Sequence, residues 1–535
     1  MSRDSGMAGS AARTSIAIFG SRILGLVRDV VLNSIFGAGA ALDAFWTAFR
    51  VPNLLRDLLA EGALSAAFTT TFSKTMTTEG KEQAFALANR MLTSMAVGIS
   101  IICVLGIIFA EPIIVYTIGS GFDPAKQVLT VELTRILFPF IWFVSLAAIY
   151  MGLLNSLGSF ALPASASSVF NIVSILSGLG LGYYLDPDLG DKAIYGFAVG
   201  TVIGGVAQLI VQMPRAGKDG LQLRPRFDWN HPKLVKVYRL ALPAIFGVAA
   251  VQLNVVINMT WASHMGDGAV TYFNNAFRLM QLPIGMFGVA IGMVALPSVS
   301  ISAAEENMQH FRWRVVEGLK LALFLTVPAS IGLCIFSEPI IGMIYEHGRF
   351  LSEDVAQTAL LLQAFTLGLA GYACIKVLAP TFYALDMPRV PVMVSVRAIG
   401  LNLLFTFVFI RIFDWGLISL PLSVSIVALL NLFQLSFALS RKLGSLTSGT
   451  NFPGFFVKMI LLSIAIAAVA WVTIQLGYPG EAGFLERLLF LGISIPLIGT
   501  VYFYLAHVLR IEEGSRLLST FRKKVQPAGA DTTDG

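Results

Sequence analysis

The sequence predicts an integral membrane protein built entirely of α-helices, and three observations support this fold class. Hydrophobic residues make up 56% of the 535-residue chain and charged residues only 13%, about half the charged share of soluble domains. Apolar runs of about 20 residues, long enough to cross a bilayer as a helix, recur along the whole chain. Two pairs of segments also resemble each other at nearly the same offset, which indicates an internal repeat.

Hydropathy predicts about fourteen transmembrane spans. The first carries Arg22, Arg28 and Asp29 and has no small-residue cleavage pattern after it, so we expect a retained span and not a signal peptide. Spans longer than the bilayer requires are expected to tilt or to project beyond it. The predicted limits are 13–37, 42–72, 84–118, 130–156, 160–185, 192–214, 236–263, 269–300, 313–346, 356–384, 390–411, 415–440, 453–477 and 484–508.

Loop charges predict the orientation of these spans. Lysine and arginine are enriched in the cytoplasmic loops of membrane proteins, and an even number of spans places both termini on one side. We therefore expect cytoplasmic termini, a basic cytoplasmic linker at 215–235 and a cytoplasmic tail at 509–535. The opposite loops offer only Lys126, Lys192, Arg349, Arg411 and Arg487, whereas the basic side holds Lys74, Lys81, Arg215, Lys218, Arg224, Arg226, Lys233, Lys236, Arg312, Arg314, Arg389, Arg441 and Lys442.

The internal repeat predicts two similar lobes. "GAALDAFWTAFR" at 39–50 aligns with "DGAVTYFNNAFR" at 267–278, an offset of 228, and "AEPII" at 110–114 aligns with "SEPII" at 337–341, an offset of 227. The offset covers six spans, and an even number gives both copies the same orientation. We expect an N-lobe at 13–214 and a C-lobe at 236–440, followed by two further helices within 453–508. Transporters of this design carry their substrate between the lobes.

The second predicted span is unusually charged. Charged side chains near a bilayer centre each cost roughly 2.5–3.5 kcal/mol by insertion scales, so they should face protein or water. At about 100° per residue, four of the five fall on one stripe, while Arg56 points elsewhere on an ideal helix. Pro52 is expected to kink the helix. The five ionisable residues are Asp43, Arg50, Arg56, Asp57 and Glu61.

Spans one and eight also carry polar faces. Arg22 shares a face with Asp29 in the first span, and Arg28 lies beside that face. Arg278 leads a similar stripe in the eighth span. Adjacent residues on a helix point apart, so Arg28–Asp29 and Arg56–Asp57 ion pairs are not expected. Asp43 and Arg22 have an alternative position at a membrane edge, where they would reach water.

The surplus of arginine predicts a site for an anion. Guanidinium groups match phosphate oxygens and stay charged when partly desolvated, whereas a proton-coupled drug exporter would show lone carboxylates and aromatic walls. The chain has no P-loop, no metal-ligand spacing among its histidines, no serine–histidine–acid arrangement and no nucleic-acid signature. We therefore expect a transporter and not an enzyme, without a metal or cofactor. Cys103, Cys334 and Cys374 lie in apolar runs and are expected to be reduced thiols.

Four stretches resemble the MurJ (MviN) family of bacterial lipid II flippases, within the multidrug/oligosaccharidyl-lipid/polysaccharide exporter superfamily. They are "SRILGLVRDVVLNSIFGAG", "DAFWTAFRVPNLLRDLLAEGALSAAF", "FRLMQLPIGMFGVAIGMVALPSVS" and "KVLAPTFYALDMPRVP". The resemblance covers essentially the whole chain through the last span. It implies a cationic central cavity in the bacterial cytoplasmic membrane. It also implies that lipid II, the undecaprenyl-pyrophosphate-linked peptidoglycan precursor, is turned from the inner to the outer leaflet.

The resemblance also implies roles for particular residues. Arg22, Arg28, Arg56 and Arg278 match arginines that are functionally important in the family, so they are the expected substrate-binding residues. Some members have an acidic residue at the position of Phe277 and glutamate at that of Gln281, so acidic partners on this helix are not implied here. The last two helices, 453–477 and 484–508, would form a groove for the lipid tail. The expected gating or charge-pairing residues are Asp29, Asp43, Arg50, Asp57 and Glu61.

Two alternatives stay open at the level of sequence. The first is a flippase for another undecaprenyl-linked glycan, or a drug exporter of the same superfamily. The second is a non-transporting scaffold of the cell-wall machinery, which need not keep a charged cavity. The expected partners are lipid II and membrane lipids, and cell-wall synthesis proteins are a further candidate class. Membrane potential is the expected energy source, and the coupling ion is left open.

Overall fold

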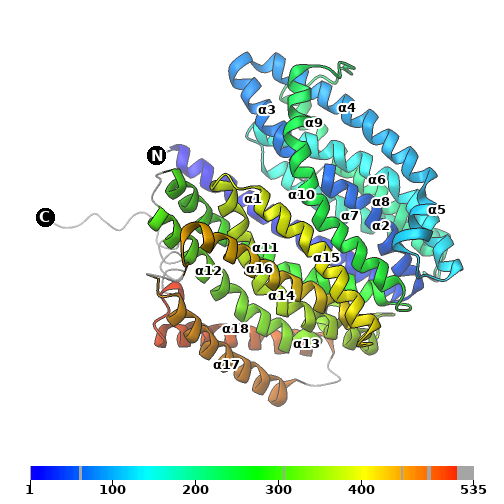
Figure 1. Ribbon diagram of the computed structural model, residues 1–535. Coiled ribbons are helices and arrows are strands. Elements are labelled where there is room, and N and C mark those ends of the chain that lie inside the picture. The colour runs from blue at the N-terminus through cyan, green and yellow to red at the C-terminus, as the bar shows by residue number, and fades with distance from the viewer. Residues whose placement is uncertain (1, 60–62, 305–307, 447–449, 479–482, 515–535) are drawn as a thin grey trace. The chain divides into compact units, whose positions relative to one another are not determined.

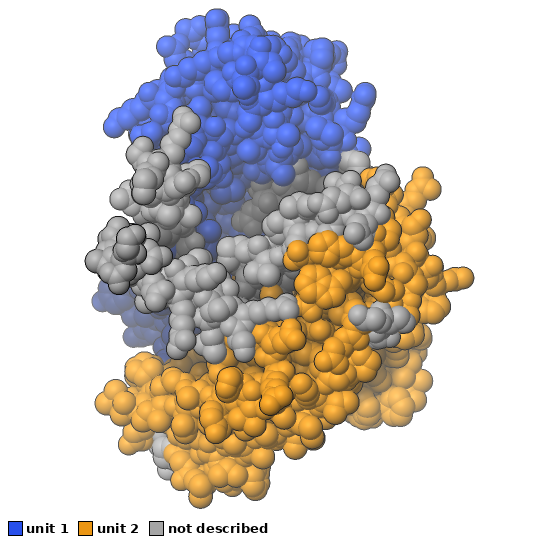
Figure 2. All heavy atoms as spheres, turned by 90° about the vertical axis from the view of Figure 1, so that its left-hand side faces the viewer, with its two compact units in different colours: residues 1–272, 345–354 blue, residues 273–344, 355–535 orange. Residues whose placement is uncertain are grey.

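The computed structural model describes residues 2–59, 63–304, 308–446, 450–478 and 483–514. Within them the regular structure is helical throughout, as the sequence predicts (Figure 1). The chain forms two compact units, which Figure 2 colours separately. The first unit consists of residues 1–272 and 345–354, and the second of residues 273–344 and 355–535.

The first unit contains the helices that precede residue 273. They are α1 (Ser2–Phe36), α2 (Ala40–Leu59), α3 (Ala63–Glu79), α4 (Lys81–Ile108), α5 (Ala110–Ile113), the π-helix η1 (Ile114–Ile118), α6 (Pro124–Ser156), α7 (Ala161–Leu185), α8 (Ala193–Ile210), α9 (Met213–Lys218), α10 (Pro232–Ser263) and the first turn of α11 (Ala269–Ala304).

The second unit contains the rest of α11 and the helices that follow it. They are α12 (Met308–Ile335), α13 (Ser337–Tyr345), α14 (Ser352–Ala384), α15 (Arg389–Arg411), the 3₁₀ helix η2 (Gly416–Ile418), α16 (Ser419–Leu443), α17 (Phe452–Gly477) and α18 (Phe484–Val508). The last residue of α13 and the first turn of α14 belong to the first unit.

Ten helical segments of the described chain are long and apolar enough to cross a membrane. They coincide with ten of the predicted spans, from 84–118 to 192–214 and from 313–346 to 484–508. The other four predicted spans are helical as well, in α1, in α2 and α3, in α10 and in α11. α1 and α2 are the helices that carry most of the predicted site residues.

Several predicted spans are not single helices. Span 42–72 is formed by α2 and α3, on either side of residues 60–62, which are not described. Spans 84–118 and 313–346 each break at a phenylalanine, Phe109 and Phe336, three residues before Pro112 and Pro339. A proline nitrogen has no hydrogen to donate to the carbonyl four residues earlier, so the helix cannot continue regularly there. By contrast, α2 continues through Pro52 as a helix.

The internal repeat is visible in local geometry. The break after α4 has a hydrogen bond of 2.8 Å from Phe109 N to Leu105 O, and the break after α12 has one of 2.8 Å from Phe336 N to Gly332 O. The two donors lie 227 residues apart in the chain, the offset of the second repeated motif. In each unit the repeated segment therefore breaks its helix in the same way.

Stacked phenylalanines repeat as well. Phe45 and Phe49 of α2 stack with ring centroids 6.2 Å apart and planes 7° apart. Phe273 and Phe277 of α11 stack at 6.1 Å and 9°. These two pairs are related by the offset of 228, so α2 and α11 present equivalent aromatic faces.

Glycines allow α7 and α8 to pack backbone against backbone. A Cβ on Gly196 would lie 2.3 Å from the backbone nitrogen of Gly182, and one on Gly200 would lie 2.5 Å from that of Gly178. Small residues of this kind permit close helix packing in membranes, where burial of apolar surface contributes little. α1 packs along α7, where Asn171 Nδ2 donates to Ser21 O at 3.2 Å. The α7–α8 pair thus supports the helix that carries Arg22 and Arg28.

The last two helices pack against α12. Tyr502 of α18 donates a hydrogen bond of 2.5 Å to the carbonyl of Phe324, which is fully buried. The outer faces of α17 and α18 are apolar and exposed, with Leu476 at 84% and Ile493 at 67%. The predicted tail does not leave the protein at residue 509, because Glu513 is buried and lies 3.9 Å from Lys320. Residues 515–535 are outside the described chain.

Candidate functional site

The predicted stripe on α2 is held by a residue of α10. Gln252 Nε2 donates to Asp57 Oδ2 at 2.8 Å, and the amide oxygen of the same side chain accepts a hydrogen bond from Arg50. Arg50 and Asp57 are seven residues apart, so two helical turns bring them to one face. Sequence reasoning missed Gln252, because a lone glutamine in an apolar span carries no spacing signal.

Two adjacent ion pairs correct the expectation from sequence. Arg56 Nη2 lies 3.0 Å from Asp57 Oδ1, and Arg28 Nη2 lies 3.2 Å from Asp29 Oδ1. The expectation considered only the directions of the Cβ atoms. An arginine side chain is long enough to fold back across the helix surface, so its guanidinium reaches the neighbouring carboxylate. The guanidinium of Arg56 thereby contacts the polar stripe of α2, although its Cβ points to another side of an ideal helix.

Arg28 is held in a partly buried, aromatic position. Its side chain is 11% exposed, and its guanidinium carbon lies 5.8 Å from the ring centre of Phe49 on α2 and 5.6 Å from that of Phe170 on α7. Asp29 is fully buried. Aromatic faces attract a cation, and a guanidinium held in this way is of the type that binds anions. Arg22, which lies nearer to the start of α1, is exposed.

Asp43 binds the first turn of α11. Its carboxylate is fully buried and accepts hydrogen bonds from Gly268 N at 2.8 Å, from Thr271 N at 2.8 Å and from Thr271 Oγ1 at 2.7 Å. A carboxylate at this position satisfies N–H groups that have no partner inside the helix and lies at the positive end of the helix dipole. Asp43 therefore does not reach water at a membrane edge, which removes that alternative. Thr271 is also the residue that corresponds to Asp43 in the second copy of the repeat, at the offset of 228.

Lys126 completes this network and was missed as a functional residue. The loop charges predict that Lys126 lies in a loop, but it lies in the first turn of α6 and is 4% exposed. Its Nζ lies 2.8 Å from Asp43 Oδ2 and 2.8 Å from Asp267 Oδ1. The same Nζ is 4.2 Å from the ring centre of Phe122. The sequence holds one signal: Asp123 and Pro124 start the helix, which puts Lys126 in its first turn.

The repeat counterpart of Lys126 makes a related contact. Asp354, 228 residues further on and in the first turn of α14, accepts a hydrogen bond of 2.6 Å from Tyr272 Oη. The cation Lys126 in the first copy therefore binds Asp267, and the anion Asp354 in the second copy binds Tyr272. Both partners lie at the start of α11.

The end of α1 joins the same region through backbone contacts. Arg349 N donates to Ser34 O at 2.8 Å. Gly37 and Gly348 have φ angles of +63° and +61°, and a Cβ on either would lie within 2.5 Å of a backbone oxygen across this contact. Only glycine fits both the backbone conformation and the space. These contacts connect one end of each of five helices, α1, α2, α6, α11 and α14. The loop charges predict that these ends lie outside the cell.

Arg278 belongs to the second unit, whereas Arg22, Arg28 and Arg56 belong to the first. It is partly buried on α11, next to Phe277, whose ring centre lies 5.5 Å from that of Phe365. Glu61 lies outside the described residues. Among the residues that are described, no group of three or more His, Cys, Asp or Glu side chains is arranged to hold a metal ion. Cys103, Cys334 and Cys374 are free thiols, as predicted.

The charged side chains of α2 bind one another and residues of neighbouring helices, in a fold that solved transporters share. Two solved structures illustrate this similarity. One is described as "Lipid II flippase MurJ, inward closed conformation"; it is 27% identical, with a TM-score of 0.74, over 92% of this chain and 98% of that one. An inward-facing multidrug resistance MATE family transporter is 16% identical with a TM-score of 0.66, over 82% of this chain and all of that one, and shows the same fold.

Sequence comparison identifies the family within this class. Residues 32–490 match the family model described as lipid II flippase MurJ. The lipid II flippase MurJ of Burkholderia cenocepacia is 32% identical over 91% of this chain and 95% of its own length. The probable lipid II flippase MurJ of Bdellovibrio bacteriovorus is 32% identical over 95% of each chain. The chain belongs to the MurJ family of lipid II flippases.

Proposed function

We propose that this flippase turns lipid II from the inner to the outer leaflet of the bacterial cytoplasmic membrane by alternating access. Arg22, Arg28, Arg56 and Arg278 bind the pyrophosphate in this proposal. The observation that carries it is the position of Arg28, partly buried between two aromatic rings and beside the carboxylate of Asp29. A guanidinium that is already partly desolvated loses little hydration when it binds phosphate oxygens.

The charge balance of α1 and α2 supports an anionic substrate. Asp43 is paired with Lys126 of α6, so it does not neutralise an arginine on these two helices. Asp29 and Asp57 are the other described carboxylates on the α1 and α2 site faces, and each is shared with an adjacent arginine. The described part of this site therefore holds more arginines than carboxylates, which favours the binding of a pyrophosphate.

The Asp43 network is the proposed gate on the release side. In the proposed orientation, with both termini in the cytoplasm, the network joins the outer ends of the helices. Release requires the carboxylate of Asp43 to leave the first turn of α11 and Lys126 to leave Asp267. Asp29, Arg50, Asp57 and Glu61 take the accompanying gating or pairing roles, in which Gln252 exchanges partners. The polyprenyl tail stays in lipid or along the exposed faces of α17 and α18, which are apolar.

Membrane potential is the proposed energy source. Moving one elementary charge through 100 mV is worth about 2.3 kcal/mol. An inside-negative potential favours the outward movement of an anionic headgroup, so transport needs no ATP site.

The test is to replace Arg28 or Arg278 with alanine and to measure lipid II turnover in cells depleted of their own flippase. Lys218→Ala, which removes an exposed charge from α9, is the control. We expect turnover to be lost in both arginine variants and kept in the control at equal protein levels. Normal turnover in both variants would overturn the assignment of the phosphate site. Failure of the unaltered protein to rescue these cells would favour another undecaprenyl-linked glycan.

A further inference from the structure

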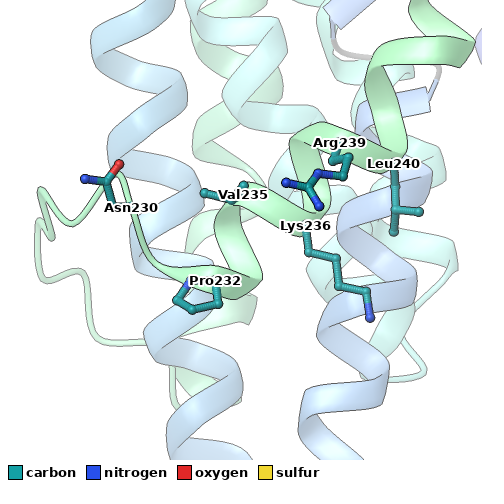
Figure 3. A pocket seen from close by; sticks show the side chains of 6 residues that line it. All are labelled: Asn230, Pro232, Val235, Lys236, Arg239 and Leu240. Atoms are coloured by element: carbon teal, nitrogen blue, oxygen red, sulfur yellow. The ribbon is translucent and has the colours of Figure 1, made fainter.

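A pocket of about 500 Å³ lies at the start of α10, apart from the charged groups described above (Figure 3). This volume is in the range of small-ligand sites. In the proposed orientation this end of α10 is cytoplasmic. The described residues that line it come from one short stretch of chain and are Asn230, Pro232, Val235, Lys236, Arg239 and Leu240.

Two cations of the pocket have no acidic partner among the described residues. Lys236 and Arg239 are both exposed and line the pocket. Two nearby cations do have acidic partners: Lys233 pairs with Glu79 of α3, and Arg90 of α4 lies 3.4 Å from Asp228. Residues three apart are neighbours on a helix, so Lys236 and Arg239 repel each other. An anion bound between them would remove this repulsion.

Apolar side chains surround the two cations. Val235 and Leu240 line the same pocket and are 37% and 51% exposed, and Leu242, the next exposed residue, is at 54%. In a protein that spans a membrane, exposed apolar side chains of this kind contact acyl chains. The pocket thus combines cations that bind phosphate with a surface that suits lipid tails.

The pocket faces away from the charged stripe on α2. Leu234, Val237 and Ala241 form the packed face of α10 and are at most 1% exposed. Gln252 is 18 residues after Leu234, which is five helical turns at 3.6 residues per turn, so it lies on that packed face. Lys236 and Arg239 lie on the opposite side of the helix. This arrangement favours a lipid of the surrounding membrane as the occupant of the pocket, over the substrate proposed to bind near the polar stripe of α2.

We propose that this pocket binds the phosphate group of an anionic phospholipid in the cytoplasmic leaflet. The bound lipid stabilises the position of the first turns of α10, and α10 in turn places Gln252 between Arg50 and Asp57. The inference rests on the orientation given under the proposed function, because only that orientation puts the pocket at the cytoplasmic surface. Binding therefore adjusts how firmly the α2 stripe is held.

The test measures lipid binding to the full-length protein by native mass spectrometry, with phosphatidylglycerol and phosphatidylcholine as probes. The variant K236Q/R239Q removes both cations. The control K218Q/R226Q removes two exposed charges from α9 and the loop that follows it, outside the pocket. We expect roughly thirtyfold weaker phosphatidylglycerol binding in K236Q/R239Q, little change in the control and no effect on phosphatidylcholine. The variant K236R/R239K keeps both cations and should bind normally.

Three results would overturn the proposal. Unchanged phosphatidylglycerol binding in K236Q/R239Q would show that the pocket is not a site, and an equal loss in the control would show a general effect of surface charge. Displacement of phosphatidylglycerol by undecaprenyl pyrophosphate at lower concentration would make the pocket part of the substrate path. Binding is measured without transport, so these results are independent of the turnover assay on Arg28→Ala.

Discussion

At the scale of single residues, Asp43 and Lys126 form the most completely buried ion pair of the candidate site. Asp43 has no exposed surface and accepts four hydrogen bonds, one of them from Lys126 Nζ at 2.8 Å. A buried pair of this kind adds little compared with an apolar pair of the same size, but removing one partner leaves an uncompensated charge. The two residues are therefore expected to depend strongly on each other.

The substitution Lys126→Met tests this dependence. It keeps the length of the side chain and removes its charge, so Asp43 and Asp267 both lose their cation. We expect a loss of about 3–5 kcal/mol in the free energy of unfolding, measured by thermal unfolding of the purified protein. The double variant D43N/K126M should recover part of this loss, because no buried charge is left without a partner. Equal stability of the single variant and the unaltered protein would contradict the prediction.

His231 is the residue for which a pH effect can be derived. Its Nδ1 accepts a hydrogen bond of 3.3 Å from Lys233 N and caps α10. Burial lowers the pKa of this imidazole below its ordinary value, and the charges of Arg90 and Lys233 act in the same direction, against Asp228 and Glu79. A neutral ring is therefore favoured in the folded protein, and only a ring with an unprotonated Nδ1 can accept this bond.

Stability should consequently fall on acidification. The folded protein binds the His231 proton less tightly than the unfolded chain, so stability decreases as the pH falls below the unfolded pKa of about 6.5. We expect a loss of up to about 1 kcal/mol, the usual worth of a helix cap. Thermal unfolding between pH 7.5 and 5.5 measures it. His231→Asn keeps a capping side chain that does not titrate, and an equally steep pH dependence in that variant would contradict the role of His231.

At the scale of elements, the contact between α7 and α8 depends on glycine. A Cβ on Gly196 meets backbone atoms of Gly182, which cannot move without separating the helices. The change Gly196→Ala should therefore destabilise the protein by roughly 1–3 kcal/mol despite the better helix propensity of alanine.

Gly180 on the same α7 helix offers a matched control. Apart from the neighbouring backbone of α7 itself, no heavy atom of the described chain lies within 4 Å of the position of its Cβ, so Gly180→Ala gains helix propensity without a clash. Thermal unfolding of the two variants should give shifts of opposite sign, or no shift for Gly180→Ala. A loss of the same size in both variants would show that close packing of α7 on α8 is not the cause.

At the scale of the whole molecule, transport is expected to respond to the electrical potential. Valinomycin with external potassium collapses that potential, and the amount of lipid II reaching the outer leaflet should then fall severalfold, since each charge gains about 2.3 kcal/mol per 100 mV. Nigericin, which removes the pH gradient alone, should have little effect. Sensitivity to nigericin without sensitivity to valinomycin would instead indicate coupling to protons.

Periodicity predicted the parts of the site that a single helix presents. Seven-residue spacing places Arg50 and Asp57 on one face, and their common partner Gln252 shows that they do share it. The prediction that Arg56 and Asp57 do not form an ion pair was wrong. A helical wheel gives the direction of the Cβ atom, and it does not give the position that a flexible guanidinium group reaches. Lys126 and Gln252 were missed, since each acts through a helix distant in sequence.

The amino-acid sequence alone established a helical membrane protein with an internal repeat, its family and an arginine-rich polar face, because hydropathy, spacing and motif are local properties of the chain. Only the tertiary structure decided which groups meet. Asp43 binds Lys126 and the first turn of α11, and Gln252 joins Arg50 to Asp57. Those contacts link residues 83 to 228 positions apart, and a buried polar group must find a partner wherever packing brings one.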